Sequence, residues 1–283
     1  MQVAKNLISH SLSPLYSKEE IESITKLIFE KVLGLTRLQV YLNQHEIISA
    51  ANLAQIKEIL NRLSHFEPIQ YILGETEFYG LKFIVNQAVL IPRPETEELV
   101  EWIVNDFKNL SPKILDIGTG SGCIPISLLK NLPEALAEAW DISSEALDVA
   151  KLNASLNQVD IGFCYADVLN SVFPENQKLY DIIVSNPPYV TQSEQSQMLK
   201  NVTDYEPDMA LFIRDSDPLV FYRLIADIAC SRLKTDGNLY FEINERFGNE
   251  VVELLKSKGF SNVVLKKDIN GKDRMVKAGL KSS

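Results

Sequence analysis

The tetrapeptide Asn186-Pro187-Pro188-Tyr189 follows an apolar run, residues 180–184, that is typical of a buried strand. Its two prolines fix φ and remove two backbone donors, so the segment cannot continue a sheet. It could instead present two acceptors, the Asn186 side-chain oxygen and the Pro187 carbonyl oxygen, beside the Tyr189 ring. Such a set suits a planar amino group, held in plane by the acceptors and covered by the ring. The alternative is a simple turn, because Asn and Pro are common turn residues.

A second candidate site is the glycine-rich segment Asp116-Ile117-Gly118-Thr119-Gly120-Ser121-Gly122. Alternating glycines let the backbone turn sharply and approach a ligand, and a helix N-terminus behind them offers free N–H groups. The spacing differs from the dinucleotide fingerprint, in which Cys123 would have to serve as the last small residue, and the segment lacks the Lys-Ser/Thr ending of a P-loop. A plain turn is the alternative here too.

Acidic residues stand at the ends of the next two expected strands. Asp141 could accept hydrogen bonds from both hydroxyls of a ribose, or it could cap the following helix. Asp167 could accept from an adenine amino group while Val168 packs on the ring, or it could be an ordinary loop aspartate. Ligands of open α/β sheets bind at the carboxyl ends of strands. Four consecutive strand ends with suitable groups therefore predict one ligand site.

Strands and helices alternate over the part of the chain that carries these groups. The expected strands are residues 113–117, 137–142, 161–166, 180–185 and 238–243, and the expected helices are 124–130, 144–156 and 218–233. This alternation predicts an α/β fold with a parallel sheet, right-handed crossovers and helices on both faces. Asn270-Gly271 between two β-prone runs predicts a hairpin, and hence an antiparallel strand closing one edge of the sheet.

The first 70 residues have helical periodicity and predict a small helical bundle. Ser17 and Glu20 form a capping-box pattern, and Gly34 is a stop signal. The β-prone residues 71–85 predict a hairpin, and residues 91–97 predict a loop or pocket rim before a helix capped by Thr96. We therefore expect an N-terminal helical domain (1–70), a hairpin linker (71–90) and a ligand-binding domain (91–283).

Composition excludes several classes of function. The chain of 283 residues has a net charge of −10, which disfavours nucleic acid as the principal substrate. It has neither an apolar run of about 18 residues nor a signal-peptide pattern, so we expect a cytoplasmic protein without membrane association. Three scattered cysteines indicate reduced thiols, and all three histidines precede residue 66, so we expect no metal site among the downstream motifs: Cys123, Cys164, Cys230; His10, His45, His65.

Together these motifs resemble the class I S-adenosylmethionine-dependent methyltransferases. Within that class the chain is similar to the protein-(glutamine-N5) methyltransferases that modify peptide chain release factors, and the similarity extends over nearly the whole chain. The matching segments are residues 91–97, 116–122, 141–143, 186–189 and 205–207, together with the pattern Asp268-x-x-Gly271-x-x-Arg274. The resemblance implies a Rossmann-like seven-stranded sheet with an antiparallel edge strand, preceded by a helical domain that recognises the protein substrate.

The resemblance also implies the roles of individual residues. S-adenosylmethionine would bind the strand ends, and the tetrapeptide would hold the amide of a glutamine in the Gly-Gly-Gln motif of release factors. The implied cofactor-binding residues are Gly118, Thr119, Gly120, Ser121, Gly122, Asp141, Val168 and Asn186, to which the strand-end pattern adds Asp167. The implied catalytic and substrate-binding residues are Asn186, Pro187, Pro188 and Tyr189. The expected partner is a release factor and the expected state a monomer. The chain departs from many members in the segment after Glu242, residues 243–247, where they carry Gly and Gln, and at Val168, where some carry an aromatic residue.

Three alternatives remain on sequence grounds. A methyltransferase acting on an exocyclic amine of adenine or guanine in DNA or rRNA would use a similar tetrapeptide, but it should have a basic face. A noncatalytic module that binds a translation factor would not need the intact glycine loop, Asp141 and Asn186. An NAD-dependent oxidoreductase is disfavoured by the glycine spacing and by strand ends that offer no acid or base for hydride transfer.

Overall fold

The computed structural model describes residues 1–35, 37–42, 48–174 and 179–280. His45 lies outside these ranges. The chain divides into two compact units, which we describe separately: residues 1–74 with 199–205, and residues 75–198 with 206–283. None of the described helices combines the length and the apolarity that a membrane crossing requires.

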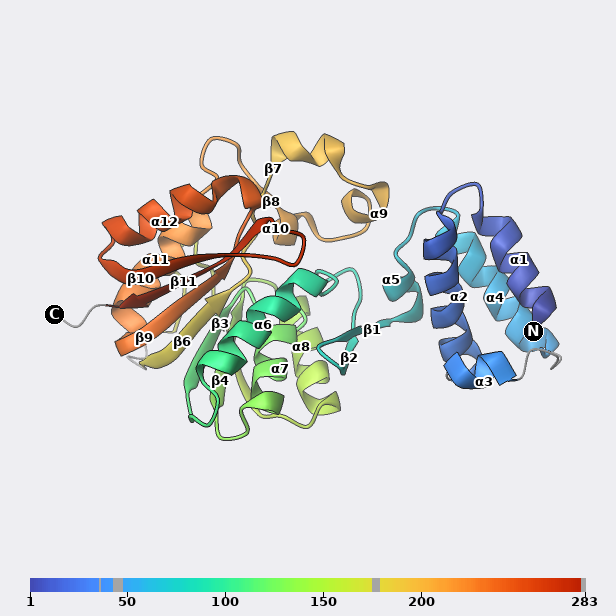
Figure 1. Ribbon diagram of the computed structural model, residues 1–283, viewed down its shortest axis with the longest axis horizontal. Helices are drawn as coiled ribbons and strands as arrows, with labels where there is room; N and C mark the ends of the chain where they lie inside the picture. Colours follow the sequence, from blue (N-terminus) through green and yellow to red (C-terminus); the bar gives the residue numbers. More distant parts are fainter. Residues whose placement is uncertain (36, 43–47, 175–178, 281–283) are drawn as a thin grey trace. The chain divides into compact units, whose positions relative to one another are not determined.

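The first unit consists of helices, as its periodicity predicts. They are α1 (Gln2–Leu12), α2 (Lys18–Leu33), α3 (Arg37–Leu42), α4 (Ala50–Leu63), α5 (Ile69–Leu73) and α9 (Lys200–Thr203) (Figure 1). The predicted capping box is confirmed: the Ser17 side chain accepts from Glu20 N, and the Glu20 carboxylate accepts from Ser17 N at 2.8 Å. Gly34 ends α2 with φ +65°, as expected. The apolar faces of α1, α2 and α4 meet in one buried cluster.

The second unit contains a seven-stranded sheet in the order β10-β11-β9-β6-β3-β4-β5. The strands are β3 (Lys113–Ile117), β4 (Leu136–Asp141), β5 (Ile161–Tyr165), β6 (Tyr180–Ser185), β9 (Leu233–Glu242), β10 (Phe260–Lys267) and β11 (Asp273–Leu280). β5, β4, β3, β6 and β9 pair in parallel, and β11 is antiparallel to both β9 and β10. The predicted fold class and the antiparallel hairpin at Asn270-Gly271 are therefore confirmed.

Helices cover both faces of this sheet because its strands alternate apolar residues between two cores (Figure 1). Ile182 and Val184 of β6 join one core with α6 (Pro94–Asp106), α7 (Cys123–Asn131) and α8 (Ser144–Leu156). Ile183 points to the other face and packs with α11 (Val220–Arg232) and α12 (Gly248–Ser257). Burial on both faces explains why these strands are continuous apolar runs in the sequence.

Smaller elements complete the second unit. A hairpin of β1 (Glu75–Phe78) and β2 (Leu81–Ile84) precedes α6, and β7 (Val190–Thr191) pairs in parallel with β8 (Phe212–Ile213). The 3-10 helices η1 (Gln192–Gln197) and η2 (Glu245–Phe247) and the short α10 (Asp208–Leu211) complete the unit.

Two local expectations were wrong. The hairpin predicted from residue 71 begins at Glu75, because residues 71–73 complete the last turn of α5 before Gly74, which has φ +73°. The helix predicted to start after Thr96 already starts at Pro94, with Arg93 in the capping position. A proline is favoured in the first turn of a helix, where its missing N–H costs nothing. Thr96 therefore lies within the first turn, and its hydroxyl is available for a distant partner.

Candidate active site

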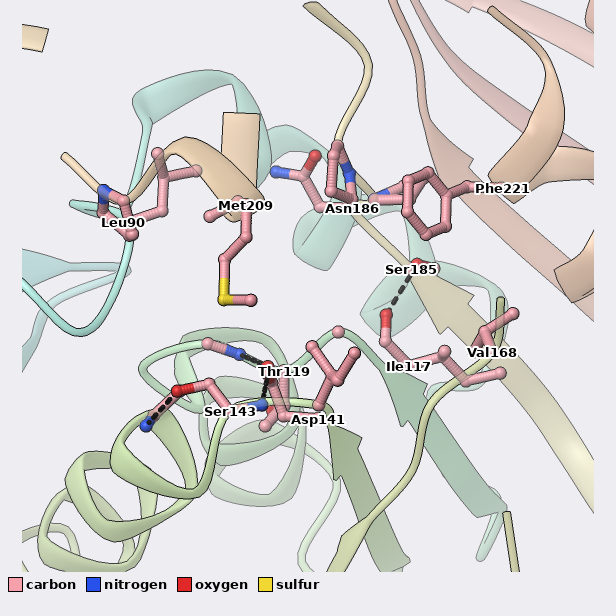
Figure 2. A pocket seen from close by; sticks show the side chains of 18 of the residues that line it. Leu90, Ile117, Thr119, Asp141, Ser143, Val168, Ser185, Asn186, Met209 and Phe221 are labelled. Atoms are coloured by element: carbon pink, nitrogen blue, oxygen red, sulfur yellow. Dashed lines mark hydrogen bonds between the residues drawn. The ribbon is translucent and has the colours of Figure 1, made fainter. Parts of the chain in front are cut away.

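A cavity of about 670 Å³ lies at the carboxyl ends of β3, β4 and β6 and beside the segment that follows β5. The chain runs from β3 outward to β4 and β5, then returns to the other side of β3 as β6. Such a switch point is where open α/β sheets bind ligands. In Figure 2, Asn186 lies on one side of the cavity and Asp141 and Ser143 lie on the other.

Among the described residues, the cavity lining includes all but two of the residues named from the sequence. The lining residues are Gly118, Thr119, Gly120, Ser121, Asp141, Asp167, Val168, Asn186, Pro187 and Pro188. The two that lie outside it are Gly122 and Tyr189. Residues as much as 70 positions apart in the sequence, from Gly118 to Pro188, therefore line one cavity.

The glycine loop is shaped by backbone conformation. Gly118, Gly120 and Gly122 have φ of +76°, +54° and +79°. The N–H of Gly118 donates to the Trp140 carbonyl at 2.8 Å, which ties the start of the loop to β4. A Cβ on Gly122 would lie 3.2 Å from the Cβ of Ala150 in α8. The absence of a side chain at Gly122 therefore serves close packing of α7 against α8, outside the cavity.

Asp141 is held by the loop that it faces. One carboxylate oxygen accepts from Gly120 N at 2.8 Å and the other from Ser143 N at 2.9 Å. Ser143 is the N-cap of α8, since its side chain accepts from Ala146 N. Burial raises the pKa of Asp141, and its backbone hydrogen bonds lower it. Each carboxylate oxygen has about two acceptor positions, so both can still accept from a ligand hydroxyl.

Asp167 and Val168 follow β5 and face the same cavity. The Asp167 carboxylate accepts from the backbone N–H of Asn170 at 3.1 Å and from its side-chain amide at 2.7 Å. These bonds fix the turn and leave acceptor capacity on a buried carboxylate. Val168 offers a small apolar surface beside it.

The Asn-Pro-Pro-Tyr turn is tied to two residues that the sequence interpretation did not select. The Asn186 side-chain nitrogen donates to Thr96 Oγ1 at 3.3 Å, and Thr96 Oγ1 donates to Glu242 Oε2 at 2.6 Å. The Tyr189 hydroxyl donates to Glu242 Oε1 at 3.0 Å. Burial raises the pKa of Glu242, and burial followed by the Glu242 charge raises the pKa of Tyr189. An acid inside the apolar run Leu239–Ile243 is the sequence signal that could have identified Glu242.

The proline-bracketed segment 91–97 supplies one rim of the cavity. Arg93 forms an ion pair with Glu206 at 2.6 Å, and the same carboxylate accepts from Ile91 N at 3.2 Å. The Glu206 side chain is only 1% exposed, so this pair fixes Arg93 more firmly than a surface salt bridge would. The Met209 side chain extends into the cavity between Asn186 and Asp141 (Figure 2).

Asp116 lies directly beneath the glycine loop and is fully buried. Within the described part of the chain, neither of its carboxylate oxygens has a hydrogen-bonding partner. Burial, opposed in part by the nearby Thr119 hydroxyl and aided by the neighbouring Asp141 charge, raises the pKa of Asp116 to about 7. A buried acid without partners is costly, and such groups concentrate at functional sites.

These groups fit a nucleoside that carries a cationic chain. The two oxygens of Asp141 match a ribose diol, and Asp167 with Val168 matches an amino-bearing base. The Asp116 carboxyl is buried beneath the glycine loop, outside the cavity lining, and could favour a positively charged substituent above the loop only through its electrostatic potential. Asn186, on the opposite side, offers an amide to a second molecule.

Comparisons with known proteins agree with this arrangement. Residues 6–74 match the model of the PrmC N-terminal domain, and residues 95–204 match that of the methyltransferase small domain. A release factor glutamine methyltransferase of Flavobacterium psychrophilum is 49% identical over 277 residues, which cover 96% of each chain. A Bacteroides thetaiotaomicron protein of the same name is 45% identical, covering 96% of this chain and 97% of its own.

Solved structures agree at the level of the fold. A methyltransferase from Pyrococcus furiosus superposes with a TM-score of 0.54 at 15% identity, covering 80% of this chain and all of its own. A T. thermophilus 16S rRNA N2 G1207 methyltransferase, solved with AdoMet and guanosine, superposes with a TM-score of 0.52 at 16% identity, covering 73% and 50%. From the two full-length relatives above, the chain belongs to the release factor glutamine methyltransferase family.

Proposed function

We propose that this chain transfers a methyl group from S-adenosylmethionine to the side-chain amide nitrogen of a glutamine in peptide chain release factors, within their Gly-Gly-Gln motif. The proposal rests mainly on one observation: Asn186 and Asp141 lie on opposite sides of one cavity. A site for an amide at Asn186 therefore faces a site for a nucleoside at Asp141. Family membership at 49% identity supports the same reaction.

The nucleoside side of the cavity would bind S-adenosylmethionine. When bound, S-adenosylmethionine supplies an electrophilic methyl group on a sulfonium. Asp141 would accept from the ribose hydroxyls, and Asp167 and Val168 would hold the adenine. The glycine loop lets the backbone approach the rest of the molecule, and Asp116 provides negative potential beneath it.

The amide side of the cavity would activate the glutamine amide nitrogen, which is a poor nucleophile. The lone pair of an amide nitrogen is delocalised into its carbonyl group. The Asn186 side-chain oxygen and the Pro187 carbonyl oxygen would accept from the two N–H bonds, stabilising the positive charge that develops on the nitrogen. The same bonds would aim the nitrogen at the methyl group, so positioning and electrostatics would carry most of the catalysis.

The Tyr189 ring completes the proposed amide site. Tyr189 lies outside the cavity lining in this structure, with its hydroxyl on Glu242. Its contribution would therefore be to hold the turn and to cover the substrate amide once that amide has entered. The proton would leave to water after transfer, because the carboxylate beside the turn, Glu242, already accepts from the hydroxyls of Thr96 and Tyr189.

The helical first unit is proposed as the place where the release factor is recognised. Its match to the PrmC N-terminal domain, residues 6–74, supports this assignment. The proposal includes a division of labour among residues 1–70, 71–90 and 91–283, a monomeric enzyme, and a cytoplasmic location. The net charge of −10 favours a protein over a nucleic acid as substrate.

The proposal can be tested with labelled S-adenosylmethionine offered to release factor, DNA and RNA in parallel reactions. We expect label only in the release factor. Label in DNA or RNA would support the nucleic-acid alternative, and no transfer to any of the three would support a noncatalytic binding module. Glutamine methylation is thus separable from both alternatives in one experiment.

A further inference from the structure

We infer that Thr96 and Glu242 are positioning residues that fix which end of the Asn186 side-chain amide is offered to the substrate. This inference rests on the proposed function of the Asn-Pro-Pro-Tyr turn and deepens it. An asparagine amide has nearly the same shape in its two flipped orientations, but one presents an acceptor and the other presents a donor. Only the acceptor can hold the N–H groups of a substrate amide.

The direction of the hydrogen bonds sets the orientation. A threonine hydroxyl has one hydrogen, and that of Thr96 is directed to Glu242 Oε2 at 2.6 Å. Toward Asn186 the hydroxyl can therefore only accept, and it accepts from the side-chain nitrogen at 3.3 Å. The Asn186 oxygen is left for an incoming group. A flipped amide would bring that oxygen against a hydroxyl oxygen whose hydrogen is already committed.

Burial makes this orientation hard to reverse. Thr96 is 2% exposed and Glu242 is 1% exposed, so water has little access to replace either bond. Burial raises the pKa of Glu242, while the hydroxyls of Thr96 and Tyr189 and the charge of Arg274 lower it. The two carboxylate oxygens of Glu242 accept from the hydroxyls of Thr96 and Tyr189, and the short bond from Thr96 fixes its hydrogen.

The strand that provides Glu242 also holds the end of the turn. Glu242 accepts from the Tyr189 hydroxyl at 3.0 Å, and Asn244 donates its side-chain N–H to the Tyr189 carbonyl at 3.0 Å. Asn244 also donates to Glu194 at 3.0 Å, which directs its amide toward the turn. Asn244 lies in the segment 243–247, where this chain departs from the family pattern, and it holds the backbone of Tyr189 while Glu242 holds the Tyr189 side chain.

A purely structural role for Thr96 and Glu242 is the competing explanation, and the two make different kinetic predictions. A structural tie would lower stability and change cofactor binding together with turnover. A positioning relay would lower kcat and leave the affinity for S-adenosylmethionine and the fold unchanged. It would also depend on the hydroxyl of Thr96 rather than on its methyl group.

The test compares Thr96→Val, Thr96→Ser and Glu242→Gln with Ser127→Ala, using the full chain and a release factor as substrate. Ser127 is a matched control, because within the described part of the chain its buried hydroxyl has no partner and it does not line the cavity. Turnover is measured by methyl transfer, the Kd for S-adenosylmethionine by calorimetry, and the fold by thermal unfolding.

We expect Thr96→Val to lower kcat about tenfold while the Kd for S-adenosylmethionine stays within about twofold, a size typical of losing one positioning hydrogen bond. Thr96→Ser should restore most of that kcat, and Ser127→Ala should leave it unchanged. In Glu242→Gln the amide can face Thr96 with either end, so kcat should fall by about threefold to tenfold. The double variant Thr96→Val/Glu242→Gln should have a kcat close to that of Thr96→Val alone, because both substitutions break the same chain of hydrogen bonds.

Unchanged turnover in both Thr96→Val and Glu242→Gln would overturn the inference, as would a Thr96→Ser variant as slow as Thr96→Val. If Thr96→Val does not fold, Glu242→Gln alone decides between these outcomes. Failure of the proposed function is distinguishable, because in that case the unsubstituted chain itself would transfer no methyl group to the release factor.

Discussion

The two sides of the cavity hold their functional groups in different ways. On the nucleoside side, the glycine loop and Asp141 are joined by backbone N–H groups over a short stretch of chain: Gly120 N donates to Asp141 at 2.8 Å across 21 positions. On the amide side, side chains from three distant segments are joined. Asn186 reaches Thr96 across 90 positions, and Thr96 reaches Glu242 across 146.

Because of this contrast, the two sides should respond differently to mutation. Backbone donors remain when a side chain is replaced, so a change on the nucleoside side should weaken binding and leave the site's shape in place. On the amide side the geometry itself depends on side chains, so a change there should lower turnover. Substitutions on each side can separate binding from turnover, and the most severe loss is expected at Asn186.

Asn186→Ala should lower kcat at least about a hundredfold, because it removes an acceptor that stabilises charge in the transition state. The Kd for S-adenosylmethionine should stay within about tenfold, because Asp141 and the glycine loop are untouched. Single-turnover methyl transfer and calorimetry measure the two quantities. Full activity in this variant would show that the turn does not hold the reacting nitrogen.

Asp141→Ala should have the opposite effect. Losing a charged acceptor for two hydroxyls should raise the Kd for S-adenosylmethionine by about tenfold to a hundredfold. At saturating cofactor, kcat should stay close to that of the unsubstituted enzyme. An unchanged Kd would refute the ribose role of Asp141 and remove the distinction between the two sides.

Asp116 provides a pH-dependent test of the nucleoside side without cofactor. Its pKa, raised to about 7 by burial, lies above the value of 3.8 for an exposed aspartate. The unfolded chain therefore loses this proton first. As a result, the free energy of unfolding should fall as the pH rises from about 4 to about 7 and then level off.

The size of the effect follows from this shift. Between pH 5 and pH 8 the Asp116 contribution should fall by about 2 to 3 kcal/mol. Asp116→Asn should lack this component, so the difference in unfolding free energy between the two proteins, measured with urea, should change by that amount. Parallel pH profiles for the two proteins would contradict the raised pKa.

The mildest change is expected from two glycines of the same loop. Gly118→Ala and Gly122→Ala both place a side chain at positive φ, which costs about 1 kcal/mol. A Cβ at Gly118 meets no atom within 4 Å, whereas at Gly122 it meets Ile126 Cδ1 at 3.0 Å. Urea unfolding should show Gly122→Ala to be less stable by about 1 kcal/mol more. Equal losses would show that α7 and α8 can separate at little cost.

The difference between the two sides of the cavity also explains why the nucleoside side could be predicted from the sequence. The strand boundaries of β3 and β6 and the acids at strand ends follow from local patterns, and the structure agrees with them. The carboxyl ends of neighbouring parallel strands must meet at one edge, so Gly118, Asp141 and Asn186 could be grouped from the sequence alone.

The residues that support the turn could not be found in this way. Thr96 looks like a helix cap, and it is the proline at position 94 that moves the helix start and frees its hydroxyl. Glu242 is visible as an acid in an apolar strand, but its partners depend on how β9 lies beside β6 and on where α6 packs. Such contacts between distant segments come from tertiary packing, which local patterns do not encode.

The most direct test of the proposed reaction is to determine which atom of the release factor receives the methyl group. Release factor incubated with the enzyme and S-adenosylmethionine is digested, and its peptides are mapped by fragmentation mass spectrometry. We predict one added methyl group on the side-chain amide of the glutamine in the Gly-Gly-Gln motif, and none when the enzyme carries Asn186→Ala. A methyl group on any other residue, or equal modification by the Asn186→Ala enzyme, would contradict the proposed reaction.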